Sequence, residues 1–193
     1  MPQPDHISAL GVPPEDTLPD DLQEIWAKCR EKLGFVPNVF QTLSLKPQRL
    51  RDFMQLFNEI MLSPSRLSKL EREMVAVVVS SANRCYYCLV SHGAAVRKLS
   101  GDPALGEMLA MNFRVAPLDA RMRGMLEFAW KLTLTPSEVV EADRMELRGL
   151  GLDNVDIFDL AQVIGLFNLS NRMAIATDMM PNTEYATLGR TTP

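Results

Sequence analysis

The chain has 193 residues, of which 47% are hydrophobic and 23% are charged, and its formal net charge is -4 at pH 7. This length and composition are typical of a folded globular protein with one substantial core. The acidic balance gives no basic excess that would attract nucleic acid or an anionic membrane, so we expect neither as a partner.

Apolar runs such as Met74–Val79 are far shorter than the roughly 20 residues that span a bilayer. The first residues lack the basic start and apolar middle of a signal peptide. We therefore expect a cytoplasmic protein. Three cysteines in such a chain argue against a structural disulfide framework and favour a reactive or metal-binding pair.

Residues 1–20 hold five of the thirteen prolines and show no periodic pattern. We expect them to form an extended arm that lies on the body or on a neighbouring subunit, while residues 21–193 form one domain. The first helix is predicted to begin near Asp20, because apolar residues recur from there at helical spacing, and to end at Gly34. Its Cys29 falls on the apolar face, where it is expected to pack as a small hydrophobe.

A turn at Phe35–Asn38 leads into a short helix, and a longer helix is predicted over residues 48–61. Ser68 and Glu71 then fit a capping box that opens the next helix. From Met74 to Ala82 this segment is apolar or small on every side, which indicates a helix buried all round. A strand is the alternative for its three successive valines, but no alternating partner lies nearby.

Asn83-Arg84 forms a short joint before a helix over residues 85–99, which Gly101 ends. Further helices are predicted over residues 103–112 with Asp102 as N-cap, 119–132, from a capping box at Thr135–Glu138 to 149–151, and 154–178 with Asp153 as N-cap. Because every segment is helical and no strand pattern appears, the predicted fold class is all-α, a helical bundle.

A similar order of residues occurs twice in the chain. Glu73–Asn83 and Asp159–Asn168 each begin with an acid, continue with mostly apolar residues and end in Asn. A duplicated helix pair would produce this pattern, and so would the general resemblance of core helices. Both explanations stay open at this point.

Cys85, Cys88 and His92 follow one another at three and four residues, so their side chains share one face of the predicted helix. A helix N-terminus, a nearby base and a Cys-x-x-Cys partner each lower a thiol pKa from its usual value of about 8.5. Such a pair can close a disulfide reversibly. His92 can take the proton of Cys88, with Glu73 orienting the imidazole.

Other interpretations of these residues are open. Two cysteines, one histidine and one glutamate are ligands of the kinds that bind zinc, although a second Cys or His pair downstream is missing. The cysteines and the histidine can also be core residues, and Glu73 can pair with Lys69 on the same helix. Tyr86 and Tyr87 can wall a pocket, form a subunit contact or be amphipathic residues at a helix start.

The pattern of Glu73, the apolar run to Asn83, and Cys85-x-x-Cys88-x-x-x-His92 resembles the signature of the AhpD-like alkylhydroperoxidases within the carboxymuconolactone decarboxylase superfamily. Three further segments resemble the branch of peroxidase-related proteins: Leu33–Val39, Phe167–Arg172 and Pro181–Tyr185. The resemblance implies an AhpD-like all-α fold, assembly into homo-oligomers (dimer, trimer or hexamer) and reduction of hydroperoxides without a cofactor or a metal.

By this resemblance the activity is peroxiredoxin-like. Cys88 is the attacking thiolate, which the peroxide oxidises to a sulfenic acid, and Cys85 resolves it as a disulfide. His92, through a water, and Glu73 form the proton relay, and a lipoyl dithiol or a thioredoxin-like protein resets the pair. AhpD has a histidine where Tyr87 stands, so disulfide formation or the choice of reductant is expected to differ.

Two other classes of function remain as alternatives. The superfamily name implies a lactone decarboxylase or hydrolase on the same fold, in which the cysteines have no role. A zinc-stabilised structural or interaction module would use Cys85, Cys88, His92 and Glu73 as ligands.

Overall fold

The computed structural model describes residues 3–190, and these residues form α-helices and short 3₁₀ turns without a β-strand. The α-helices are α1 (Asp20–Leu33), α2 (Asn38–Leu43), α3 (Pro47–Leu62), α4 (Lys69–Ala82), α5 (Tyr86–Ser100), α6 (Leu105–Asn112), α7 (Ala120–Leu134), α8 (Glu141–Gly149) and α9 (Asn154–Ala176). The predicted all-α fold class is confirmed. The outermost parts of the predicted arm and domain, residues 1–2 and 191–193, lie outside the described residues.

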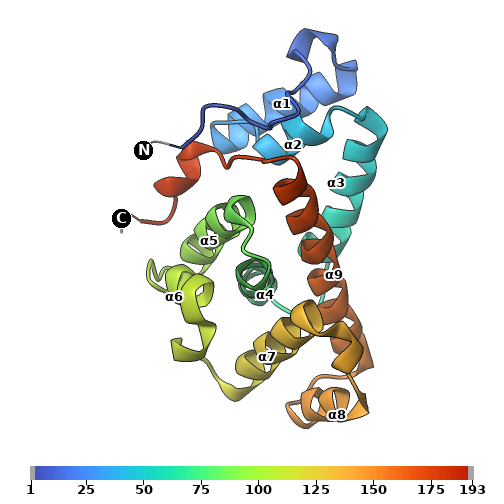
Figure 1. Ribbon diagram of the computed structural model, residues 1–193, viewed down its shortest axis with the longest axis vertical. Coiled ribbons are helices and arrows are strands. Elements are labelled where there is room, and N and C mark those ends of the chain that lie inside the picture. The colour runs from blue at the N-terminus through green and yellow to red at the C-terminus, as the bar shows by residue number, and fades with distance from the viewer. Residues whose placement is uncertain (1–2, 191–193) are drawn as a thin grey trace.

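Helix α4 lies at the centre of the molecule and packs against α5, α6, α7 and α9 (Figure 1). All of its residues from Met74 to Ser80 are buried. A helix that is apolar or small on every side is stable only when neighbours cover it all round, and these four helices do so. The buried-helix prediction is confirmed, and the strand alternative for the valines is wrong.

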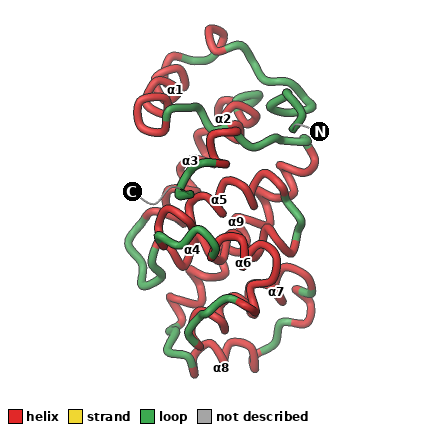
Figure 2. Tube along the Cα trace, turned by 90° about the vertical axis from the view of Figure 1, so that its left-hand side faces the viewer, coloured by secondary structure: helices red, strands yellow, loops and turns green. Residues whose placement is uncertain are grey.

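Different helices form the two ends of the molecule (Figure 2). Helices α1 and α2 lie at one end, where Leu22, Trp26 and Leu50 belong to a small separate core, and α8 lies at the other end (Figure 2).

None of the helices described in residues 3–190 combines the length and the apolar character that crossing a bilayer requires.

The N-terminal residues lie along the C-terminal segment of the same chain. The N–H of Ala9 donates to the carbonyl of Thr177 at 2.9 Å, and the N–H of Met180 donates to the carbonyl of Ile7 at 3.0 Å. These hydrogen bonds join the arm to the body of its own chain, which is one of the two positions expected for it.

Two of the predicted caps, at Ser68 and Asp153, are present, and Asp119 provides one that was not predicted. Ser68 and Glu71 form both halves of the capping box at the start of α4, and the side chains of Asp119 and Asp153 cap α7 and α9. Glu71 also pairs with Arg121 of α7, so this cap ties two helices together.

Two predicted helix starts are wrong. The Asp102 carboxylate accepts the N–H of Ala104 at 2.8 Å in a local turn, and α6 begins only at Leu105. The Thr135 hydroxyl donates to the carbonyl of Lys131 at 3.4 Å and accepts no backbone N–H as a cap. Residues 136–138 form a 3₁₀ turn instead, and α8 begins at Glu141, where Asp143 accepts the N–H of Val140.

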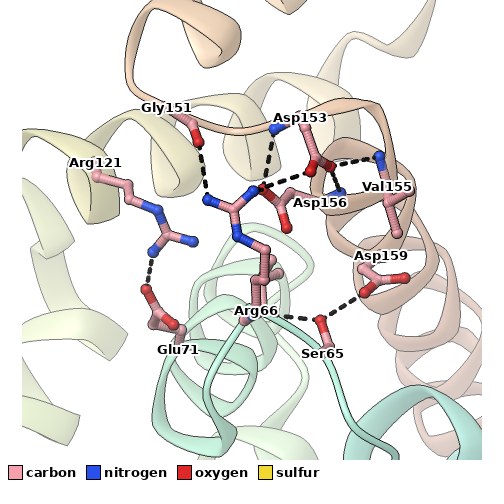
Figure 3. Close-up of polar contacts among 10 residues, drawn as sticks. Ser65, Arg66, Glu71, Arg121, Gly151, Asp153, Val155, Asp156 and Asp159 are labelled. Atoms are coloured by element: carbon pink, nitrogen blue, oxygen red, sulfur yellow. Dashed lines mark hydrogen bonds and ion pairs between the residues drawn. The ribbon is translucent and has the colours of Figure 1, made fainter.

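A polar cluster fixes the start of α9 against the loop between α3 and α4 (Figure 3). The Arg66 guanidinium contacts Asp153 at 3.0 Å and the buried Asp156 at 2.8 Å. The Ser65 hydroxyl donates to Asp159 at 2.5 Å. These contacts position α9 relative to α4, and the second half of α9 then passes the joint between α4 and α5.

The two similar segments meet in space at their asparagines. The Asn83 side chain donates to Asn168 Oδ1 at 3.1 Å, which links the end of α4 to α9. This contact does not test the duplication of a helix pair, which stays a prediction.

Candidate active site

The joint between α4 and α5 is a tight reversal that places the two helices side by side. Arg84 adopts a left-handed backbone with φ 55°, and the N–H of Cys85 donates to the carbonyl of Ser80 at 2.9 Å. The chain therefore turns back directly after α4. This reversal brings His92 of α5 next to Glu73 of α4.

Glu73 and His92 form a close pair. Glu73 Oε2 lies 2.6 Å from His92 Nδ1, and the two side chains are 14% and 15% exposed. The imidazole and the Phe167 ring of α9 lie nearly perpendicular, with 4.5 Å between the ring centroids. A carboxylate at Nδ1 holds the proton on that nitrogen, so Nε2 is the basic nitrogen of the neutral ring. Glu73 thus pairs with His92 and not with Lys69.

Cys85 and Cys88 are free, buried thiols at the start of α5. The neighbouring Cys88 thiol, together with the helix N–H groups of Cys88 and Tyr87, lowers the pKa of Cys85 to about 7. The pKa of Cys88 is raised well above its usual range by Cys85 and by burial. Cys85 is therefore the thiol of the pair that ionises first, and the resting thiolate is favoured on Cys85.

Helix α9 supplies polar groups beside Cys88 that the sequence analysis did not assign to the site. Ser170 Oγ lies 3.9 Å from Cys88 Sγ. Asn171 is fully buried, donates to Ser80 Oγ at 3.0 Å and accepts from Asn83 at 2.9 Å. Asn171 and Ser170 act to lower the pKa of Cys88, against the larger opposing influences. The sequence contains a signal for these two residues, because Ser170 and Asn171 are polar positions within a mostly apolar helix.

A cavity of about 250 Å³ adjoins these groups. Its polar wall contains Glu73, Tyr87, His92 and Ser170, whereas neither thiol lines it. Its remaining lining residues are Leu33, Pro37, Val39, Phe40, Phe53, Phe57, Ser91, Ala95 and Tyr185. The cavity is thus mostly apolar. On the side of the thiols its wall is formed by Ser170, whose hydroxyl is in contact with Cys88.

The two tyrosines of the Cys-x-x-Cys segment face opposite ways. Tyr87 is buried in the cavity wall, and its hydroxyl accepts the N–H of Val39 at 3.1 Å. Burial raises the pKa of Tyr87 well above its usual range and that of the nearby Tyr185 to about 12, so both phenols are neutral. Tyr86 is exposed and donates to Gln3 of the N-terminal arm at 3.4 Å.

The predicted site residues form two pairs and not one ligand set. Within residues 3–190, no three His, Cys, Asp or Glu side chains converge closely enough to hold a metal ion. His92 is hydrogen-bonded to Glu73, and no hydrogen bond among the described residues joins it to Cys85 or Cys88. This geometry gives no support to the zinc-stabilised module.

Residues 47–104 match the carboxymuconolactone decarboxylase family, and this range contains all four predicted site residues. It does not contain Ser170, Asn171 or Tyr185. No curated protein matches the chain.

Several solved structures have the same fold. An uncharacterized peroxidase-related protein from Silicibacter sp. TM1040 is 56% identical, with a TM-score of 0.94, over 98% of this chain and 100% of that one. An uncharacterized peroxidase-related protein from Ralstonia eutropha JMP134, described as an alkylhydroperoxidase AhpD core, is 40% identical, with a TM-score of 0.94, over 100% of both chains. The debrominase Bmp8 in its apo form is 18% identical, with a TM-score of 0.75 over 96% of both chains, which is a likeness of fold alone.

The identities to the two peroxidase-related proteins hold over nearly the full length of all three chains. The resemblance seen in the sequence is confirmed by these matches. The chain belongs to the carboxymuconolactone decarboxylase superfamily, in the AhpD-like branch of peroxidase-related proteins.

Proposed function

We propose that this protein is a thiol-dependent hydroperoxide reductase that works through Cys85 and Cys88, with Glu73 and His92 as its proton relay. The observation that carries the proposal is the arrangement around the cavity. The 2.6 Å pair of Glu73 and His92 lines it, and the Ser170 hydroxyl in its wall lies 3.9 Å from the Cys88 sulfur. A base thus lines the cavity, and a thiol lies directly behind the Ser170 part of its wall.

The reaction has three steps. A thiolate attacks one oxygen of the hydroperoxide, the O–O bond breaks, and the alkoxide leaves as an alcohol after taking a proton from the relay. The second thiol attacks the resulting sulfenic acid, which releases water and forms the Cys85–Cys88 disulfide. An external dithiol, such as a lipoyl group or a thioredoxin-like protein, returns two electrons and two protons by thiol–disulfide exchange.

The electrostatics bear on which thiol attacks. The roles implied by the resemblance make Cys88 the nucleophile, whereas the resting thiolate is favoured on Cys85. The two are compatible because one proton shared by neighbouring sulfurs can move from Cys88 to Cys85. That shift puts the charge on the sulfur next to Ser170 and the cavity wall.

The apolar lining of the cavity favours an organic hydroperoxide over hydrogen peroxide. Phe40, Phe53 and Phe57 give it walls without hydrogen-bonding groups. Burying an alkyl or aryl group there gains about 0.8 kcal/mol for each CH₂ unit, which hydrogen peroxide cannot gain.

The test is a titration of the fully reduced protein with cumene hydroperoxide in the absence of reductant. We expect one equivalent of peroxide to be consumed while two of the three thiols are lost. Cys88→Ser is expected to abolish disulfide formation, and Cys29→Ser is the matched control that leaves it intact, because Cys29 lies outside the site. Retention of all thiols in the presence of excess peroxide would overturn the proposal.

Single variants assign the roles of the two thiols. In Cys85→Ser protein, a dimedone-type probe is expected to trap a sulfenic acid on Cys88. A trapped sulfenic acid on Cys85 in Cys88→Ser protein, with none in Cys85→Ser, would reverse the assignment. The lactone decarboxylase or hydrolase alternative gives the cysteines no role, so lactone turnover that Cys88→Ser leaves unimpaired, without peroxide turnover, would favour it.

A further inference from the structure

Helix α9 is apolar on both of its faces. Its inner face carries the residues that pack against α4 and the site. Its outer face exposes four large apolar side chains: Val155 is 66% exposed, Phe158 60%, Leu169 48% and Ile175 53%. A helix that is hydrophobic all round is typical of one that is covered on both sides.

Helix α3 extends this exposed face. It packs beside α9 (Figure 1), and its Leu56 and Leu62 are also exposed. Two hollows of about 410 and 300 Å³ lie along α3 and α9, and Leu56 lines both of them; the larger one is also lined by the end of α2 and the loop that follows it. We call the outer sides of α3 and α9 together the outer face.

Gly165 stands at the midpoint of α9 and is exposed. A Cβ added to it would meet nothing within 4 Å. Phe158 and Arg172 lie seven residues before and after it, about two helical turns in each direction, so the three positions fall nearly on one line. The lack of a side chain at the centre of that line lets the backbone of another helix approach closely.

We infer that the outer face binds a second copy of this chain, with α9 packed antiparallel against the partner's α9 about a twofold axis at Gly165. In this register Gly165 meets its own counterpart. Phe158 lies level with the partner's Arg172, and Arg172 lies level with the partner's Phe158. The same contact therefore occurs twice, once on each side of the axis, as in an isologous interface.

The charges on the outer face agree with this pairing. Arg172 donates to two oxygens of Asn168, at 2.9 and 2.7 Å, and no carboxylate among the described residues pairs with it. Asp159 accepts the Ser65 hydroxyl, and no basic side chain in the described part of the chain pairs with it. In the dimer, the partner's Arg172 lies over the Phe158 ring and next to Asp159, so each charge gains an opposite partner.

The size of the outer face suits a stable dimer. Two helices of 16 and 23 residues, each about 10 Å wide and rising about 1.5 Å per residue, present about 600 Å². Stable interfaces bury about 600 to 1,000 Å² on each partner. The two hollows along α3 and α9 can receive the partner's side chains.

Sedimentation analysis tests the surface. At about 10 µM, a concentration at which an interface of this size is expected to hold, the reduced chain is predicted to sediment as a dimer or an even multiple of one. Leu169→Glu is expected to weaken self-association at least tenfold with an unchanged helical circular dichroism spectrum. Met111→Glu is the matched control, because Met111 is 85% exposed on α6, away from the outer face. A monomeric or trimeric wild-type chain, or equal behaviour of the two variants, would overturn the inference.

Cross-linking tests the register. Two thiols introduced by Gly165→Cys lie next to each other across the axis and are expected to form an intermolecular disulfide under mild oxidation. Two thiols introduced by Val155→Cys lie on the same face but about 30 Å apart, so they are not expected to cross-link. Both variants are made in a Cys29→Ser background. Cross-linking of Val155→Cys without that of Gly165→Cys would exclude this axis.

Discussion

The α4–α5 hairpin and helix α9 contribute to the site in different ways. The hairpin holds the reactive groups within 20 residues of sequence, from Glu73 to His92, and its tight joint brings them together. Helix α9 crosses the hairpin from far along the chain, with Ser170 lying 82 residues after Cys88, and adds Ser170 and Asn171 to the surroundings of Cys88. The hairpin thus carries the groups that ionise, whereas α9 supplies neutral polar groups that adjust them.

The largest expected effect lies in the hairpin. Glu73→Gln removes the charge that orients His92 and is expected to slow thiol oxidation by cumene hydroperoxide about 10- to 100-fold. Stopped-flow measurement of peroxide consumption checks this. Glu71→Gln is the control, because Glu71 caps the same helix and pairs with Arg121, away from the cavity. A wild-type rate in Glu73→Gln would show that the relay is not used.

The next effect is on the ionisation of the thiol pair. A thiol is protonated and unreactive below its pKa, so alkylation of Cys85 by iodoacetamide is expected to rise about tenfold from pH 6 to pH 8, with a midpoint at about 7. Burial raises the pKa of Cys29, so its alkylation is expected to rise only in more alkaline solution. Peptide mass spectrometry separates the two. A shared midpoint would contradict the lowering of the Cys85 pKa by the Cys88 thiol and the helix N–H groups.

A smaller effect is expected from α9. Ser170→Ala removes a hydroxyl that favours the Cys88 thiolate, and peroxide consumption at pH 7 is expected to fall about fivefold, which corresponds to about 1 kcal/mol. Ser81→Ala is the matched control, because the Ser81 hydroxyl bonds the carbonyl of Ala110 away from the thiols. A loss as large as that of Glu73→Gln would mean that α9 carries part of the relay itself, and the contrast between the two regions would fail.

The smallest effect separates the two tyrosines of the hairpin. Tyr87→Phe leaves the N–H of Val39 without its acceptor and is expected to lower the free energy of unfolding by about 1 kcal/mol. Tyr86→Phe is expected to change it by less than about 0.5 kcal/mol, because Tyr86 is exposed. Urea denaturation measures both. Equal losses would contradict the orientation of the two rings.

Much of the fold follows from local sequence. The all-α class, the Ser68 cap, the buried run of α4 and the joint at Asn83-Arg84 were predictable because caps, periodicity and turns act over a few residues. The two wrong helix starts have a local cause as well. At Asp102 and Thr135 the side chain found another backbone partner, which composition alone does not reveal.

The sequence by itself determined the hairpin of the site, because a helix, a tight reversal and a second helix bring Glu73 to His92 whatever surrounds them. Only the tertiary structure decided what encloses that hairpin. Ser170 and Asn171 reach Cys88 because α4 needs apolar cover and α9 provides it, and Tyr185 closes the cavity from the C-terminal segment. Such contacts join residues about 80 or more positions apart, and they depend on how whole helices pack, which no local pattern encodes.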